Sequence, residues 1–166
     1  IDVVRAAVSE VEFYERIHIS ALPPHAQVVG HAADDLSHLL AELMENAVTS
    51  APPDATVEIS GRVLPSGEVA LSVVDRGTGI PAGRLKRINA YLGRCASGPA
   101  RDIAGGAPAS GAAAAAEPER EAEHATAGDT EGAGLGLYVV GRIAGRYGVR
   151  VRLRARKGGG VAAIVV

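Results

Sequence analysis

Residues 34–49 carry a helical pattern whose apolar side must pack against another part of the chain. The apolar residues recur every three or four positions and share one face: Leu36, Leu39, Leu40, Leu43 and Ala47. Asp34 or Asp35 can cap the first turn, and Pro52 and Pro53 stop the helix because neither can donate a backbone hydrogen bond. We therefore predict an amphipathic helix around which the rest of the chain is organised.

Glu42 and Asn46 lie four positions apart in this helix, so their side chains project from the same surface. A carboxylate and an amide placed in this way can hold Mg²⁺, either directly through oxygen or through its water ligands. Such pairs more often lie on a solvated helix face. The pair alone therefore does not define a site.

Strand patterns follow the central helix along the chain. Residues 56–64 and 68–75 are expected to form a hairpin through Pro65-Ser66-Gly67, and residues 149–156 and 161–166 a second antiparallel pair. Before the helix, residues 2–12 have a helical stripe, and residues 14–19 and 26–29 have short strand patterns. Together these segments predict an α/β domain.

Composition narrows the classes of function. With 166 residues, of which 47% are hydrophobic, the chain is expected to form one domain with one core. The formal net charge of −2 provides no overall positive field to attract nucleic acid. The alternating Arg150, Arg152, Arg154 and Arg156 fit a solvated sheet face better than a nucleic-acid surface, because no stacking aromatic residues accompany them.

A single cysteine, Cys95, excludes an intramolecular disulfide and a metal cluster built on cysteines, which fits a reducing compartment. No apolar run approaches the roughly 20 residues that span a bilayer, and the N-terminus lacks a signal-peptide pattern. The chain starts at Ile1 rather than at a methionine. We therefore expect a fragment of a longer protein.

The second strand of the expected hairpin runs directly into the turn Asp75-Arg76-Gly77-Thr78-Gly79-Ile80-Pro81. Its two glycines allow a sharp turn and a close approach of a ligand, and Asp75 offers a fixed acceptor at the strand end. The simpler interpretation is a glycine-rich turn with a solvated aspartate. Pro81 suits the first turn of a following helix that carries Leu85, Ile88 and Leu92.

Residues 96–131 differ from the rest of the chain. Thirteen of these thirty-six residues are alanine and five are glycine, with almost no large apolar side chains. Such a segment cannot bury enough surface to offset the entropy of ordering it. We interpret it as a flexible lid over a site, with a dispensable linker as the alternative for its middle part.

The stretch Gly132-Ala133-Gly134-Leu135-Gly136-Leu137 opens a predicted helix over residues 135–147. Glycines at alternate positions before a helix leave backbone N–H groups free, and these groups together with the helix dipole can receive a phosphate chain. Taken alone, this pattern is weak evidence for a phosphate site.

In this order, the three stretches resemble the N, G1 and G2 boxes of the GHKL ATPase superfamily, and the resemblance covers residues 26–166. Within it, Glu42-Leu-Met-Glu-Asn-Ala47 and Gly134-Leu-Gly-Leu-Tyr-Val-Val140 look like the catalytic domain of actinobacterial-type sensor histidine kinases. The resemblance implies a two-layer α/β sandwich of the Bergerat type, with helices on one face of a mixed sheet. Residues 1–25 would lead into this domain from a missing upstream region.

The resemblance also implies roles for single residues. Asn46 would ligate Mg²⁺, and Asp75 would accept a hydrogen bond from the adenine amino group of ATP. Glu42 matches a position that is a general-base glutamate in the ATP-hydrolysing relatives and is often asparagine in the kinases. The nucleotide would lie against Asn46, Asp75, Gly77, Gly79, Ile80, Gly132, Gly134, Leu135, Gly136 and Leu137.

Three departures from the family pattern stand out. Thr49 occupies a position where many kinases place a basic residue, so that charge would come from Arg76, Lys86 or Arg87. The lid lacks the usual phenylalanine, because Phe13 is the only phenylalanine of the chain. None of the five histidines lies in a phosphoacceptor pattern: His18, His25, His31, His38 and His124.

The implied function is the ATP-binding catalytic domain of a two-component sensor histidine kinase. It would transfer the γ-phosphoryl group to a histidine outside this fragment, on a dimerisation domain that serves a response regulator. The full protein would be a homodimeric, membrane-anchored sensor with this domain in the cytoplasm. The alternatives are a serine kinase of the anti-sigma type, and a degenerate nucleotide-binding or protein-interaction module.

Overall fold

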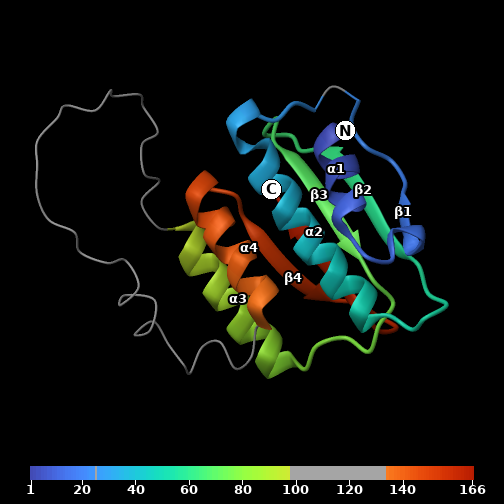
Figure 1. The fold of residues 1–166 in the computed structure, drawn as a ribbon. Coiled ribbons are helices and arrows are strands. Elements are labelled where there is room, and N and C mark those ends of the chain that lie inside the picture. Colours follow the sequence, from blue (N-terminus) through green and yellow to red (C-terminus); the bar gives the residue numbers. More distant parts are fainter. Residues whose placement is uncertain (25, 98–133) are drawn as a thin grey trace, which may run out of the picture.

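The computed structural model of the chain describes residues 1–24, 26–97 and 134–166 (Figure 1). The expected lid over residues 96–131 lies outside these ranges except for its first two positions, and Gly132 lies outside them as well. Within the described ranges, no helix combines the length and the hydropathy that crossing a bilayer requires.

The described strands form one mixed sheet in the order β1-β2-β3-β5-β4. Its strands are β1 (Ile17–Ile19), β2 (Val57–Val63), β3 (Val69–Val74), β4 (Val151–Ala155) and β5 (Val161–Val165). β1 runs parallel to β2, and the other neighbouring pairs are antiparallel. The predicted hairpin is confirmed, since β2 and β3 pair from Glu58 opposite Val74 to Val63 opposite Val69.

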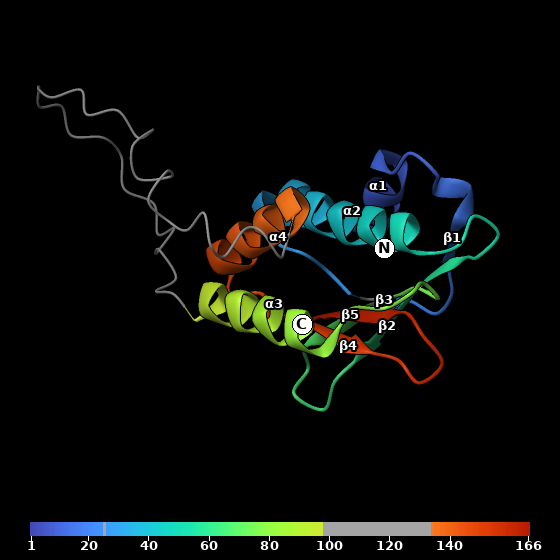
Figure 2. The ribbon, with the colours of Figure 1, turned by 90° about the horizontal axis from the view of Figure 1, so that it is seen from below.

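The helices lie on one side of this sheet. They are α1 (Asp2–Glu10), α2 (Ala33–Ser50), α3 (Ala82–Ala96) and α4 (Gly134–Tyr147), with short 3₁₀ turns η1 (Tyr14–Arg16) and η2 (Gly30–Ala32). Figure 2 shows α1, α2 and α4 as a layer over the sheet, while α3 lies next to β4. This arrangement confirms the expected two-layer α/β sandwich with a mixed sheet.

The core lies between the two layers. Its most completely buried large side chains come from α2, α3 and α4 and from the two strands of the β2–β3 hairpin. They are Leu39, Met44, Ile59, Leu92, Val57, Val73 and Val140. Burying a side chain of this size stabilises the fold by about 1.5–3 kcal/mol relative to leaving it exposed. The apolar face predicted for α2 is thus the face that holds it on the sheet, between α1 and α4.

Some local predictions were wrong. Residues 26–29 form no strand, and Val28 and Val29 are exposed because this connection has no strand to pair with. The strand expected over residues 14–19 is limited to Ile17–Ile19, since Tyr14–Arg16 form a 3₁₀ turn. A short strand pattern yields a strand only where a neighbouring edge supplies hydrogen bonds.

The expected cap of α2 was also wrong. Ala32 is the N-cap residue, and no side chain caps this helix end. Asp35 is engaged elsewhere: its Oδ2 accepts bonds from Tyr147 Oη at 2.7 Å and Arg146 Nη1 at 2.9 Å. The carboxylate therefore ties the start of α2 to the end of α4.

Asn89 of α3 closes part of the edge of the sheet. β4 is the last strand in the order, so Leu153 has no strand on its outer side. The side chain of Asn89 fills this place, because its Nδ2 donates to the Leu153 carbonyl at 2.8 Å and its Oδ1 accepts from the Leu153 N–H at 2.8 Å. One amide thus satisfies both backbone groups of an edge residue.

We expect Asn89→Ala to lower the free energy of unfolding by about 1–3 kcal/mol, because it leaves both groups of Leu153 without their protein partner. Chemical denaturation followed by circular dichroism measures the change. Arg87→Ala is the control, since Arg87 is an exposed residue of the same helix and loses no backbone partner. Equal stability of the parent and Asn89→Ala would show that water replaces the amide without cost.

Candidate functional site

Glu42 and Asn46 lie one turn apart in the C-terminal half of α2, as predicted. The Nδ2 of Asn46 donates to the carbonyl oxygen of Glu42 at 2.6 Å. Because this bond occupies the amide nitrogen, the amide oxygen is the atom that Asn46 has to offer a metal ion. An exposed amide oxygen fits Mg²⁺, which takes few protein ligands and keeps several waters or phosphate oxygens.

The start of α4 lies directly against this pair. A Cβ added to Gly136 would collide with Oε2 of Glu42 and would lie 3.2 Å from Nδ2 of Asn46. A side chain at position 136 would therefore have to displace the carboxylate of Glu42, which lies directly against the start of α4. The structure brings together the helix pair and the glycine-rich helix start, which are 90 residues apart in the sequence (136 − 46).

Burial raises the pKa of Glu42 above its ordinary value, and the negative charge of Glu45 raises it further, whereas His38 acts in the opposite direction. Its carboxylate is therefore a stronger base than that of a freely exposed glutamate. This property suits a group that accepts a proton near a phosphate chain.

Asp75 lies at the end of β3 and is only 4% exposed. Its Oδ1 accepts from the N–H of Gly77 at 2.7 Å, and its Oδ2 accepts from the N–H of Val161 at 3.1 Å. Two backbone donors from different segments thus fix the orientation of the carboxylate. The solvated aspartate of the simpler interpretation is not what the structure contains.

The turn after Asp75 packs closely on its neighbours. A Cβ added to Gly77 would collide with the carbonyl oxygen of Ser50 at the end of α2. Gly79 has a φ of +78°, a conformation that side chains with a Cβ rarely adopt. The two glycines therefore have separate roles, one in packing and one in the turn itself.

A cleft opens between α2, the turn after β3, α3 and α4. Of the predicted nucleotide residues, it is lined by Asn46, Asp75, Gly79, Ile80 and Leu137. Gly77 is buried next to it, and Glu42 meets Gly136 outside the lining. Gly134 and Leu135 form the first residues of α4, and Gly132 lies outside the described residues.

Arg84 is a cleft residue that the sequence analysis missed. It lines the cleft from the first turn of α3, whereas Arg76, Lys86 and Arg87, which were expected to supply positive charge, do not line it. Its position three residues after Pro81 could have identified it, because the first turn of that helix follows the ligand loop directly.

Among the described residues, no group of three or more acidic, histidine or cysteine side chains could hold a metal ion by itself. A bound phosphate chain and water are ligands that could complete a site built on Asn46. This donor set fits Mg²⁺ brought in with a nucleotide.

The family model of the "Histidine kinase-, DNA gyrase B-, and HSP90-like ATPase" matches residues 31–166. Since the match includes most of the chain, the chain belongs to this family. The match confirms the resemblance of the three motifs to the GHKL superfamily. The domain is thus an ATPase-type domain of the family that includes histidine kinases, DNA gyrase B and HSP90.

Solved structures of sensor kinases share the fold. The mycobacterial sensor histidine kinase MprB has a TM-score of 0.63 and 18% identity, covering 99% of this chain and 90% of that one. The histidine kinase domain of the E. coli osmosensor EnvZ has a TM-score of 0.57 and 19% identity, covering 98% and 81%. Full-length ShkA in complex with AMPPNP has a TM-score of 0.61 and 20% identity, covering 99% and 28%. No match is found among curated proteins.

Proposed function

We propose that this domain binds ATP with Mg²⁺ in the cleft and transfers the γ-phosphoryl group to a histidine outside residues 1–166. The main support is the position of Asp75, a buried carboxylate that is oriented by two backbone N–H groups and lines the same cleft as Asn46. A nucleotide with its base at Asp75 and its phosphates toward Asn46 and α4 would occupy both ends of the cleft. The similar ShkA structure contains AMPPNP, which agrees with this assignment.

Asp75 reads the base in this proposal. Each of its oxygens accepts one backbone bond and retains capacity for another. The exocyclic amine of adenine can donate to it. Guanine carries an oxygen at the corresponding ring position, which would place an acceptor against a carboxylate and leave both without a donor.

The phosphate end is held by α4 and α2. α4 begins at Gly134, and the first turn of an α-helix presents backbone N–H groups without an intrahelical acceptor together with the positive end of the helix dipole. Mg²⁺ bound with the phosphates neutralises part of their charge, which is its contribution to phosphoryl transfer. Asn46 would hold this ion through its amide oxygen.

In the transfer step, a nitrogen of the acceptor imidazole forms a bond to the γ-phosphorus while the bond from that phosphorus to the β,γ-bridging oxygen breaks, and ADP leaves. The protein supplies position and charge rather than a covalent intermediate. Glu42 lies on α2, next to the start of α4, and its pKa is raised. From this position it can accept the proton that the imidazole loses.

The acceptor histidine belongs to a dimerisation domain of the same protein in this proposal, and a response regulator takes the phosphoryl group next. Of the chain's histidines, the structure describes His18, His31 and His38, and all three are exposed. His38 pairs with Glu10 through a 2.8 Å contact on the surface formed by α1 and α2. We further propose that the domain is the cytoplasmic part of a membrane-anchored homodimer.

The proposal predicts that ATP and ADP bind much more tightly than GTP. Losing a hydrogen bond to a buried charged group costs about 1.5–3 kcal/mol, or roughly tenfold to a hundredfold in affinity. Isothermal titration of the domain with each nucleotide in the presence of Mg²⁺ measures the ratio. Equal dissociation constants for ATP and GTP would refute the role of Asp75 in reading the base.

A further inference from the structure

At the C-terminal end of α2, two carbonyl groups lack the backbone N–H donors that would continue the hydrogen bonding of the helix. The last regular bond of the helix runs from the N–H of Ala51 to the carbonyl of Ala47 at 3.0 Å. The next carbonyl, that of Val48, would take its bond from residue 52, which is a proline without an N–H group. The carbonyl of Thr49 would take its bond from residue 53, which is also a proline and has no N–H group to donate.

Arg16 supplies donors at this end. Its Nη1 donates to the Val48 carbonyl at 3.3 Å, and its Nε and Nη2 donate to the Ala55 carbonyl at 3.1 and 3.0 Å. Its Nη2 also donates to the carbonyls of Ala51 and Pro52. The half-buried guanidinium thus gathers four carbonyls, and its positive charge lies at the negative end of the helix dipole.

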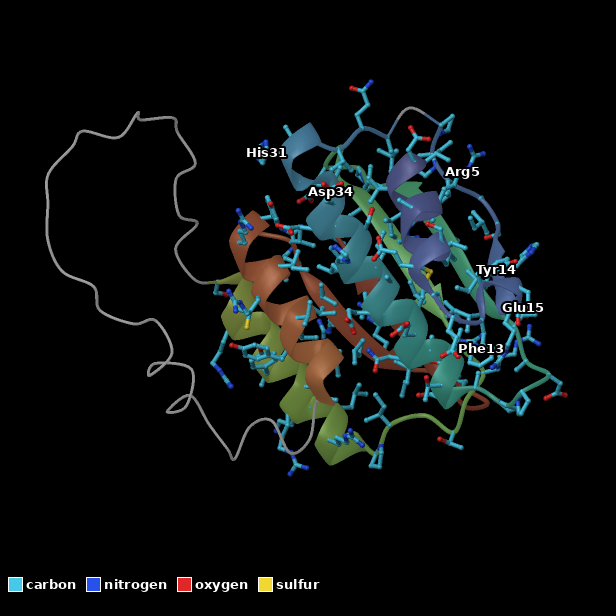
Figure 3. All side chains as sticks on the ribbon, in the orientation of Figure 1. Arg5, Phe13, Tyr14, Glu15, His31 and Asp34 are labelled. Atoms are coloured by element: carbon cyan, nitrogen blue, oxygen red, sulfur yellow. The ribbon has the colours of Figure 1, made fainter. Side chains whose placement is uncertain are left out.

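Figure 3 labels Phe13, Tyr14 and Glu15, which precede Arg16 in the chain, and shows this turn next to the C-terminal end of α2. This turn is the 3₁₀ turn η1, which precedes β1. Arg16, at the end of this turn, therefore contacts the C-terminal end of a helix that lies far along the chain. Its hydrogen-bond partner Val48 is 32 residues away in the sequence.

The helix end that Arg16 holds is in direct contact with the candidate site. Ser50, the last residue of α2, lines the cleft, and its carbonyl oxygen lies so close to Gly77 that a Cβ there would collide with it. Gly77 in turn donates to the carboxylate of Asp75. Asn46 belongs to the last turn of the same helix. A shift of this helix end would therefore move both ends of the cleft.

We propose that Arg16 is a positioning residue for nucleotide binding, acting through the end of α2 and without touching the nucleotide. The inference rests on the proposed function. Arg16 precedes the family match, which begins at residue 31, so family membership assigns it no role.

Arg16→Met tests the inference, because methionine keeps a long unbranched side chain but has no donor. We expect the dissociation constant for ATP with Mg²⁺ to rise about tenfold, equivalent to about 1.4 kcal/mol. Arg16→Lys should give a smaller rise, since an ammonium group keeps the charge but cannot reach all four carbonyls in the planar geometry of a guanidinium. Isothermal titration at a temperature where every variant is folded provides the measurement.

Tyr147→Phe is the matched control. It loosens the opposite end of α2 by removing the hydroxyl that bonds Asp35 at 2.7 Å and the His31 carbonyl at 3.2 Å. Both variants should melt at a lower temperature than the parent, but only Arg16→Met should lose affinity. Unchanged affinity in Arg16→Met, or an equal loss in Tyr147→Phe, would overturn the inference.

Hydrogen exchange separates this inference from the proposed function. In Arg16→Met without nucleotide, amides of residues 75–80 should exchange at least several times faster than in the parent, while those of β4 should be unchanged. If the parent failed to bind ATP, the proposed function would be wrong, and the exchange result would still decide whether Arg16 positions the loop. Unchanged exchange at residues 75–80 would overturn the inference in that case too.

Discussion

Replacing Asn46 by alanine is expected to abolish Mg²⁺-dependent ATP binding while leaving the fold intact. The side chain is exposed, and its only hydrogen bond among the described residues runs from Nδ2 to the Glu42 carbonyl of the same helix. Alanine favours the helix at this position, so no loss of stability should accompany the change. What the variant loses is the amide oxygen, the proposed ligand of the ion.

The size of this effect follows from the chemistry of metal sites. Changing residues that merely orient a ligand costs about tenfold to a hundredfold in metal affinity, so losing a ligand should cost about a hundredfold or more. ATP is titrated into the parent and into Asn46→Ala, once in the presence of Mg²⁺ and once in the presence of a chelator. The ratio of the dissociation constants measures the loss. In the parent the chelator should weaken binding, and in the variant it should have little further effect.

Glu42→Gln is the matched control on the same helix face. It removes the negative charge and the base but keeps a side chain of the same size against Gly136. We expect it to bind ATP with Mg²⁺ like the parent and, at most, to slow turnover. If Asn46→Ala bound ATP with Mg²⁺ as tightly as the parent, the assignment of the ion to Asn46 would be wrong.

The fold could be predicted from the sequence wherever a pattern depends on one element alone. The apolar stripe of α2 and the hairpin of β2 and β3 have local signatures, a helical period and a turn between two alternating runs. The prediction at residues 26–29 failed because these residues pair with none of the five described strands. A strand requires a partner, and the sequence of the strand does not contain it.

The same distinction applies to the site. The sequence could single out Asp75 and Asn46, which line one cleft, because their motifs are local and occur in a specific order, while their roles stay predictions. Arg16 could not be singled out, because its importance arises from prolines at positions 52 and 53, which meet it only in the folded chain. Arg84 differs in this respect, since its place in the first turn of the helix after Pro81 is a local signal that the sequence analysis did not use.

Replacing Asp75 should have the second large effect, and it should act on stability and on binding together. Asp75→Ala leaves the N–H groups of Gly77 and Val161 without an acceptor in a buried place. Each unpaired group costs about 1–3 kcal/mol, which is a large part of the stability of a small domain. Asp75→Asn keeps one acceptor oxygen but turns an NH₂ group toward one of the two donors, so it should be destabilised by a similar amount.

Chemical denaturation and nucleotide titration at low temperature, where the variants remain folded, measure the two effects separately. Asp54→Asn is the control, because Asp54 is an exposed carboxylate in the loop after α2. We expect Asp75→Asn to bind ATP about a hundredfold more weakly than the parent, and no more tightly than it binds GTP, since the amide carries no charge and keeps only one acceptor oxygen. A variant that lost stability but kept the preference for ATP over GTP would show that Asp75 shapes the loop while another group reads the base.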